Sequence, residues 1–266
     1  HEDTLKAIED TDAMAFTGST HTGRLLAAHA GRHLKKNVLE LGGSNPFIIL
    51  PDADLQRAAI DACYSRFRDA GQSCNAAKRI VVTQDIAEQF IPLFLAECAK
   101  LQTGNPKDPN TTLAPLHRQD LRQTVHEQVE DAVAHGAQCL SGGYIPDGES
   151  WFYPATVLDQ VNPNCRVWHE EVFGPVAMIL RADNPDHAVA LANDTPFGLG
   201  ACIYTADTAN AWKYAEKIQA GSVFINRHTS SDLRLPFGGV KASGYGRELS
   251  EFGLYEFVNV KTYWQK

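Results

Sequence analysis

Strand-like and helix-like segments alternate along most of this chain, and this alternation limits the fold more than any other feature of the sequence. β-Branched residues fill the stretch 79–83, while 86–101 and 121–134 carry apolar residues at helical spacing. Further strands are predicted at 138–140, 155–158, 176–180 and 201–205, and further helices at 185–193 and 208–218. Such alternation is typical of a mostly parallel sheet with helices on both faces. The sequence therefore predicts an α/β fold.

The beginning of the chain predicts a phosphate-binding corner. A short apolar strand at 12–16 is followed by a turn that contains Gly18 and Ser19, and then by a helix at 22–35. The N–H groups at the start of a helix, together with its dipole, attract anions. Ser and Thr are also favoured at the N-cap of an ordinary helix. The segment therefore fits either an anion-binding corner or a plain helix cap. We then expect one buried strand over 37–50 and a helix over 55–68, capped by 51–54.

Cys74 is the one cysteine of six whose surroundings suit a nucleophile. It follows a predicted helix and Gly71, so its thiol is expected near backbone N–H groups that lower a thiol pKa. Glu40 follows an apolar run and precedes two glycines, which predicts a carboxylate at a strand end facing a cleft. A thiol that forms a covalent intermediate and a carboxylate that activates water complete an acyl-transfer cycle. Taken singly, each residue also fits a structural role, as a buried thiol or a capping carboxylate.

Composition argues against several other classes of protein. The 266 residues have a net charge of −8 and no basic run, which gives no reason to expect nucleic acid or a membrane as a partner. No apolar stretch approaches the length of a membrane span. The six cysteines form no CxxC pair, so we expect reduced thiols in a cytoplasmic protein, with no zinc or other metal site and no disulfide framework.

Lys78 and Arg79 are expected on an exposed face.

Five motifs in order along the chain resemble those of the aldehyde dehydrogenase superfamily. They are Phe16-Thr17-Gly18-Ser19-Thr20, Leu39-Glu40-Leu41-Gly42-Gly43, Gly71-Gln72-Ser73-Cys74, Glu170-Glu171-Val172-Phe173-Gly174-Pro175 and Pro236-Phe237-Gly238-Gly239-Val240-Lys241. One Gly-rich match would be weak evidence, whereas five in order over nearly the whole chain are strong. The resemblance implies oxidation of an aldehyde to a carboxylic acid through a cysteine thiohemiacetal and a thioester. It implies Cys74 as the nucleophile and Glu40 as the base that hydrolyses the thioester.

The same resemblance implies NAD or NADP as the cofactor. The residues implied to hold it are Phe16, Gly18, Ser19, Leu41, Glu171 and Phe173. In the family, the last two correspond to a pair that holds the nicotinamide ribose and flanks the ring. The adjacent Glu170 is expected to form an ordinary ion pair.

Arg68 is the residue that indicates a substrate. Succinate-semialdehyde dehydrogenases resemble this chain in having Phe-Arg-Asp or Phe-Arg-Asn at this distance before the nucleophile. The resemblance implies that Arg68 grips the distal carboxylate of succinate semialdehyde, with help from Ser231, so that succinate is the product. The alternative is that Arg68 only ends its helix, where a cation meets the helix dipole favourably.

The resemblance covers only the C-terminal half of such enzymes. It divides the chain into a remnant of the Rossmann-like dinucleotide-binding domain at 1–40, a catalytic domain at 41–240, and a return segment with an oligomerisation strand at 241–266. Residues 257–264 alternate like an edge strand, and pairing with another copy would give a homo-oligomer, either a dimer or a tetramer. Because much of the cofactor domain would lie outside this sequence, we expect the chain to be inactive alone.

Three other functions stay open. An aldehyde dehydrogenase of another substrate specificity would share all five motifs. A CoA-acylating aldehyde dehydrogenase would keep the cysteine without needing a hydrolytic base, and Glu40 argues against it. A non-catalytic structural or assembly module would tolerate loss of both Cys74 and Glu40, and both are present.

Overall fold

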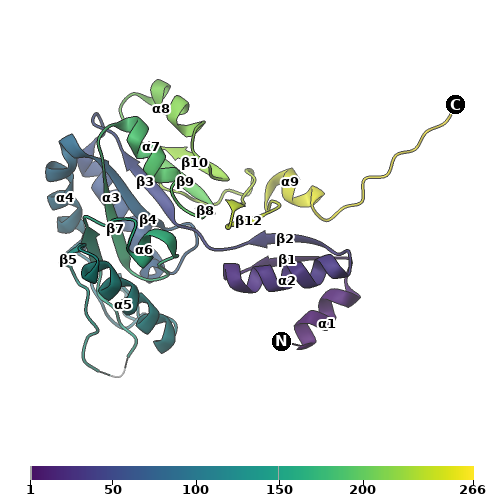
Figure 1. Cartoon of the computed structure of the whole chain (residues 1–266), viewed down its shortest axis with the longest axis horizontal. Helices are drawn as coiled ribbons and strands as arrows, with labels where there is room; N and C mark the ends of the chain where they lie inside the picture. Colours follow the sequence, from purple (N-terminus) through teal and green to yellow (C-terminus); the bar gives the residue numbers. More distant parts are fainter. Residues whose placement is uncertain (1, 149) are drawn as a thin grey trace.

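The computed structural model describes residues 2–148 and 150–266, and its largest feature is a seven-stranded sheet (Figure 1). The strand order is β10-β9-β3-β4-β7-β6-β5. Their bounds are β3 Asn45–Ile49, β4 Ala77–Thr83, β5 Gln138–Ser141, β6 Thr156–Asp159, β7 Val176–Ala182, β9 Gly200–Tyr204 and β10 Ser222–Ile225. Neighbouring strands are parallel except for β5 and β6. The predicted α/β fold with a mostly parallel sheet is confirmed.

Helices cover this sheet in two groups. α3 (Leu55–Phe67) and α4 (Gln84–Cys98) pack on each other and on β4 and β7. α7 (Pro185–Asn193) packs on β3, β4 and β7 and also contacts α8 (Thr208–Ala215). α5 (Gln119–Ala134) contacts the short α6 (Arg166–His169). Every residue of β3 and β4 is buried, as expected for parallel strands that are covered on both faces.

A smaller unit is formed mainly by the first forty residues. It contains α1 (Glu2–Asp10), β1 (Ala13–Thr17), α2 (Thr20–Arg32) and β2 (Lys36–Glu40). β1 and β2 are parallel, and β12 (Gly244–Tyr245), from the far end of the chain, pairs with β2 in the antiparallel sense. In Figure 1 this unit lies beside the larger sheet, and the segment that follows β2 connects the two.

The prediction of one strand over 37–50 is wrong. The segment forms two strands, β2 in the smaller sheet and β3 in the larger one, with Gly42 and Gly43 between them. A Cβ on Gly42 would lie 2.4 Å from Glu171 Oε2, and a Cβ on Gly43 would lie 2.5 Å from the Cys74 carbonyl oxygen. Only glycine fits at these two positions, because the chain crosses between the sheets against the site residues. Glu40 and the two glycines mark the end of the first strand, and the second strand then begins at Asn45.

The predicted C-terminal strand is not formed in the single chain. Residues 259–266 are exposed and have no regular secondary structure, and in Figure 1 they extend away from the rest of the molecule. A strand requires a neighbouring strand to accept its hydrogen bonds, and none of the described strands pairs with this segment. The pairing of the tail with another copy stays a prediction.

Several elements had no counterpart in the sequence-based expectations. They are α1, α6, β8 (Phe197–Gly198), β10, β11 (Val240–Lys241), β12 and α9 (Ser250–Tyr255). Most are very short, and short segments carry too few residues to show a period. Within 2–148 and 150–266 no helix is both long and apolar enough to cross a membrane.

Candidate active site

A cavity of about 500 Å³ lies where the two sheets meet. Seven of the predicted site residues line it: Gly18, Ser19, Glu40, Leu41, Cys74, Glu171 and Phe173. The remaining lining residues are Thr17, Gly42, Gln72, Ser73 and Leu121. The structure therefore brings together residues from four of the five motifs.

Cys74 lies just after an unusual turn. α3 ends at Phe67, and Asp69, Ala70 and Gly71 then all have positive φ angles, at 55°, 53° and 72°. Such a conformation costs free energy for residues with a side chain, so surrounding contacts must hold it. The fully buried Arg66 does so, because one guanidinium nitrogen donates to the carbonyls of Gly71, Val172 and Gly174. Burial lowers the pKa of Arg66 to about 9.

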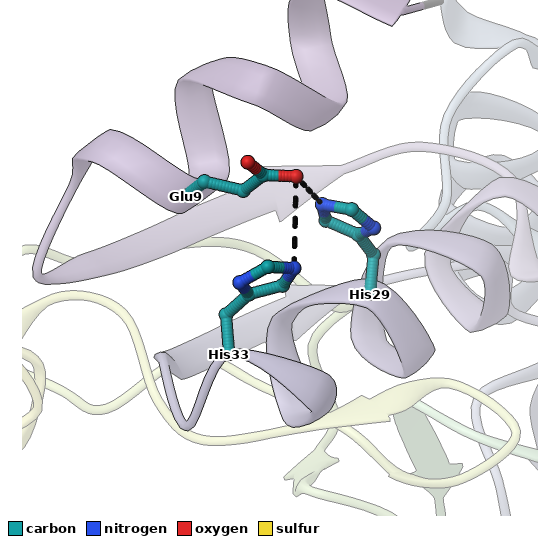
Figure 2. Close-up of side chains that lie close together, drawn as sticks. All are labelled: Glu9, His29 and His33. Atoms are coloured by element: carbon teal, nitrogen blue, oxygen red, sulfur yellow. Dashed lines mark ion pairs between the residues drawn. The ribbon is translucent and has the colours of Figure 1, made fainter.

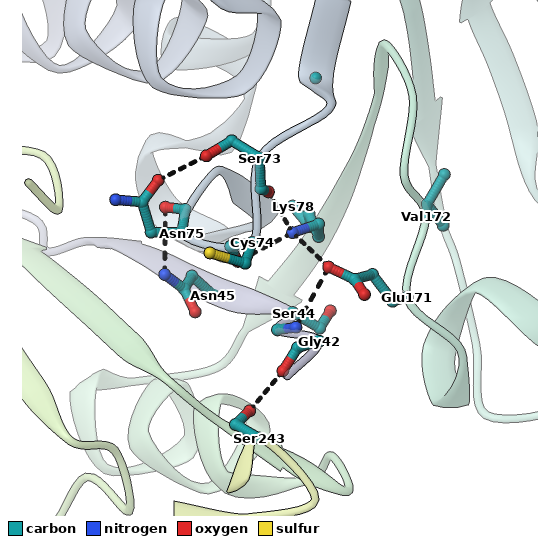
Figure 3. Close-up of polar contacts among 12 residues, drawn as sticks. Gly42, Ser44, Asn45, Ser73, Cys74, Asn75, Lys78, Glu171, Val172 and Ser243 are labelled. Atoms are coloured by element: carbon teal, nitrogen blue, oxygen red, sulfur yellow. Dashed lines mark hydrogen bonds and ion pairs between the residues drawn. The ribbon is translucent and has the colours of Figure 1, made fainter. Parts of the chain in front are cut away.

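Lys78 holds the backbone of the turn that carries Cys74. Its Nζ donates to the carbonyls of Ser73 at 2.8 Å and Cys74 at 3.0 Å, and it forms an ion pair with Glu171 Oε1 at 3.0 Å (Figure 3). The expectation that Lys78 and Arg79 are exposed is wrong, since both are almost completely buried. Arg79 likewise finds carbonyl partners, on Ser44, Leu191 and Ala192. Burial lowers the pKa of Lys78, and the carboxylate of Glu171 opposes this shift.

Glu171 connects three parts of the site. Besides the ion pair with Lys78, its Oε1 accepts a hydrogen bond from the Gly43 N–H at 3.1 Å. The carboxylate thus holds the crossing between the sheets next to the turn that carries Cys74 (Figure 3). The neighbouring Glu170 pairs with Arg166 instead, as expected of an ordinary ion pair.

The expectation of a low thiol pKa at Cys74 is wrong. Burial raises the pKa of Cys74, and the negative charges of Glu171 and Glu40 raise it further. Lys78 and the Asn75 N–H act in the opposite direction without cancelling the effect. A thiolate at Cys74 is therefore costly in this chain, and Lys78 is the cation that limits the cost.

Glu40 is placed as a base that can work near neutral pH. It ends β2 with a side chain that is only 2% exposed. Burial raises its pKa to about 7, the carboxylate of Glu248 adds to the rise, and Arg247 and the nearby Gly239 N–H oppose it. Neither carboxylate oxygen has a hydrogen bond of normal geometry among the described residues. An enclosed carboxylate with free lone pairs suits a general base.

The strand, turn and helix of the predicted corner are present at the start of α2, and the binding of a phosphate there stays a prediction. Ser19 caps this helix, because its Oγ accepts a hydrogen bond from the Thr22 N–H at 3.2 Å. The Gly18 N–H donates to the Glu40 carbonyl at 3.0 Å, which joins the corner to the base. Phe16 does not line the cavity; a Cβ on Gly18 would lie 2.6 Å from its ring.

Arg68 and Ser231 are not brought together with Cys74 in this cavity. Arg68 forms an ion pair with Asp69 at 3.1 Å and lies over the ring of Tyr64. It lines a separate cavity of about 580 Å³ between α3 and the residues that follow α4. Ser231 is exposed in the loop after β10 and lines neither of these two cavities.

Comparison with known proteins assigns the family. The cavity of this α/β chain presents a cysteine, an enclosed glutamate and the start of a helix. The sequence model described as "Aldehyde dehydrogenase family" matches residues 2–263, and the chain belongs to this family.

Individual relatives agree with this assignment. The chain is 46% identical over 265 residues to an aldehyde dehydrogenase of Paenarthrobacter nicotinovorans, covering 99% of this chain and 58% of the relative. It is 48% identical to a succinate semialdehyde dehydrogenase [NAD(P)+] of Escherichia coli, covering 95% and 55%. A crystal structure of the succinic semialdehyde dehydrogenase from Streptococcus pyogenes, in complex with NADP+, superimposes with a TM-score of 0.95 at 38% identity, covering 97% and 57%. The chain thus spans a little more than half the length of these relatives.

Glu40→Gln is expected to change how stability depends on pH. The pKa of Glu40 rises from 4.5 to about 7 on folding, so the folded state binds this proton more tightly than the unfolded state. The stability contributed by Glu40 is full below the unfolded pKa and is lost as the pH rises through the folded pKa, a loss of roughly 3 kcal/mol at about 1.36 kcal/mol per pKa unit. Urea unfolding at pH 5 and pH 8 should show this loss in the parent chain and not in Glu40→Gln. Glu251→Gln, which changes an exposed carboxylate, is the control that should behave like the parent. A loss of stability in Glu40→Gln as large as in the parent would contradict a raised pKa at Glu40.

Lys78→Gln is expected to move ionisation of Cys74 to higher pH. The change removes the cation that lowers the thiol pKa and leaves the negative charge of Glu171 uncompensated, so both effects act in the same direction. Iodoacetamide alkylation of Cys74, followed by peptide mass spectrometry across a pH series, measures the shift. Lys100→Gln, which removes an exposed lysine paired with Glu97, should leave it unchanged. An unaltered alkylation profile in a folded Lys78→Gln chain would show that this ion pair does not act on the thiol.

Proposed function

We propose that this chain supplies the catalytic half of an NAD(P)-dependent aldehyde dehydrogenase that oxidises succinate semialdehyde to succinate. The observation that supports this most is that Cys74 and Glu40 line one cavity together with Gly18, Glu171 and Phe173. These residues come from four motifs that are far apart in the sequence. The family assignment supports the reaction type, and the names of the relatives support the substrate.

The chemistry divides between the thiol and the carboxylate. The Cys74 thiolate adds to the carbonyl carbon of the aldehyde, which forms a C–S bond and a thiohemiacetal with its charge on the former carbonyl oxygen. When bound, the nicotinamide would supply the acceptor for the hydride that leaves this carbon, so that a thioester remains on Cys74. Glu40 then accepts a proton from a water molecule while the water oxygen attacks the thioester carbon. The C–S bond breaks, the carboxylic acid leaves, and Cys74 is regenerated.

The lining of the cavity fits a dinucleotide. α2 is 13 residues long and begins beside the cavity, so Gly18 and Ser19 at its start suit a pyrophosphate. Glu171 and Phe173 would hold the nicotinamide ribose and ring. The side chain of Leu41 packs against Gly23 of α2, where an added Cβ would lie 2.5 Å from it. The ring of Phe16 packs in the same way against Gly18. NAD and NADP both fit this description.

Arg68 supports a substrate with a distal carboxylate. Its side chain is 45% exposed and forms an ion pair with the exposed Asp69, which a substrate carboxylate can replace at little cost. A guanidinium binds a carboxylate with two parallel hydrogen bonds, which fixes the direction of the chain that carries the aldehyde.

The thiol and base are tested with p-nitrophenyl acetate, which needs no cofactor. The parent chain should release a burst of about one equivalent of p-nitrophenolate and carry an acetyl group on Cys74, and Cys74→Ser should lose both. Glu40→Gln should keep the burst and slow the following turnover by about a hundredfold or more, because only thioester hydrolysis needs the base. Cys139→Ser, which removes an exposed thiol, is the control that should match the parent. Acetylation at Cys139 alone, or equal loss of burst and turnover in Glu40→Gln, would contradict these roles.

The substrate is tested by protection of Cys74 from alkylation. An aldehyde that adds reversibly to the thiol protects it, and succinate semialdehyde should protect at lower concentration than butanal. Arg68→Ala should raise the half-protecting concentration of succinate semialdehyde about 10- to 100-fold, since hydrogen bonds to charged groups contribute about 1.5–3 kcal/mol, and should leave butanal unaffected. Ser231→Ala should show the same pattern more weakly, and the surface variant Arg118→Ala should show none. Equal losses for both aldehydes would remove the succinate-semialdehyde assignment and leave the aldehyde dehydrogenase assignment intact.

A further inference from the structure

Three potential metal ligands converge between the first two helices, away from the residues of the candidate active site. His29 and His33 are four residues apart, which places their side chains on the same face of α2, with His33 capping its C-terminal end. Glu9 reaches them from α1, and Figure 2 shows its carboxylate directed at both rings. The ligand atoms of all three residues lie within 4.8 Å of one another.

The two distances from Glu9 to the histidines are close to those between the ligands of a tetrahedral metal ion. Glu9 Oε1 lies 3.1 Å from His29 Nε2 and 3.6 Å from His33 Nε2. Zinc bonds to histidine nitrogen and carboxylate oxygen are about 2.0–2.2 Å long, so ligand atoms around a tetrahedral zinc ion stand about 3.3–3.5 Å apart. The rings are not in the way of one another, since their centroids are 4.8 Å apart and tilted by 39°.

Glu9 stands at ion-pair distance from both histidines (Figure 2), but hydrogen bonds of normal geometry do not account for the cluster. The separation of 3.6 Å between Glu9 and His33 is too long for a hydrogen bond. His29 Nε2 is enclosed, yet it has no hydrogen-bond partner of acceptable geometry among the described residues. A cation between the three side chains would satisfy all three atoms at once and would be balanced in part by the charge of Glu9.

We propose that Glu9, His29 and His33 form a binding site for a divalent transition-metal ion, with zinc as the best match. Two imidazoles and one carboxylate are ligands that zinc favours, and three protein ligands leave a fourth position for water. The ion clamps α1 onto α2. Among the described residues, these helices otherwise share a small apolar core of Ile8, Leu26 and Ala30, with Leu5, Met14 and Phe16 packed against it. The site is independent of the function proposed above.

Zinc titration of the 266-residue chain after removal of metal with EDTA tests the proposal. Calorimetry should give one equivalent of bound zinc, zinc should raise the melting temperature, and the amide hydrogens of α1 should exchange more slowly. Glu9→Gln, His29→Ala and His33→Ala should each lower the zinc affinity at least about tenfold, which is the loss typical of removing even a residue that only supports a metal ligand. Cobalt(II) in place of zinc should give the weak visible bands of nitrogen and oxygen ligands without the strong near-ultraviolet bands of thiolate ligands.

Two control variants separate this site from other metal-binding groups. His21→Ala removes an exposed histidine of the same helix, and Cys139→Ser removes the exposed thiol; both should bind zinc like the parent. Circular dichroism identifies any variant that does not fold. If a histidine variant does not fold, the zinc affinity of Glu9→Gln, which keeps the shape of the side chain, tests the proposal. Unchanged binding in the His29→Ala/His33→Ala double variant, thiolate bands with cobalt, or no zinc binding by the folded parent would overturn the proposal.

Discussion

The buried ammonium of Lys78 is the contact on which the rest of the candidate active site depends. A charge removed from water costs several kcal/mol unless protein groups replace its hydration. Here two carbonyls of the nucleophile turn and one carboxylate do so. Each partner is held in place as a result: the carbonyls fix the turn that carries Cys74, and Glu171 is fixed against Gly43 at the crossing between the sheets. One cation thereby aligns two segments that are nearly a hundred residues apart in the sequence and moderates the ionisation of the thiol between them.

Close packing at the crossing explains why the thiol and the base share a cavity. β2 belongs to the smaller sheet and β3 to the larger one, so the chain must pass between them within a few residues. Gly42 and Gly43 allow Glu171 and the Cys74 carbonyl to approach the backbone there. The buried Ser243 secures the passage from the other side, because its Oγ donates to the Gly42 carbonyl at 2.6 Å and accepts from the Gly198 N–H at 3.0 Å. Any side chain at the crossing would separate the nucleophile from the groups that orient it.

Much of the fold and the lining of the cavity could be predicted from the sequence, because both depend on local patterns and on motif order. Helix α7 was expected with its observed bounds, and seven predicted residues meet in one cavity. The errors concern properties that only tertiary contacts determine. Lys78 is expected to be exposed unless its partners are known, and two of them are backbone carbonyls, which have no sequence signature. The thiol pKa of Cys74 depends on its burial and on two carboxylates from other segments.

The surroundings of Glu40 come from the end of the chain. Gly238, Gly239, Arg247 and Glu248 surround its carboxylate, and β12 pairs with the strand that carries it. A ribosome releases these residues long after Glu40 and Cys74 have emerged, and protein segments begin to fold in that order. Residues 238–248 must therefore fold back onto β2 before Glu40 is enclosed as it is in the folded chain. The enclosure that raises the pKa of Glu40 therefore depends on the last segment of the chain to be synthesised.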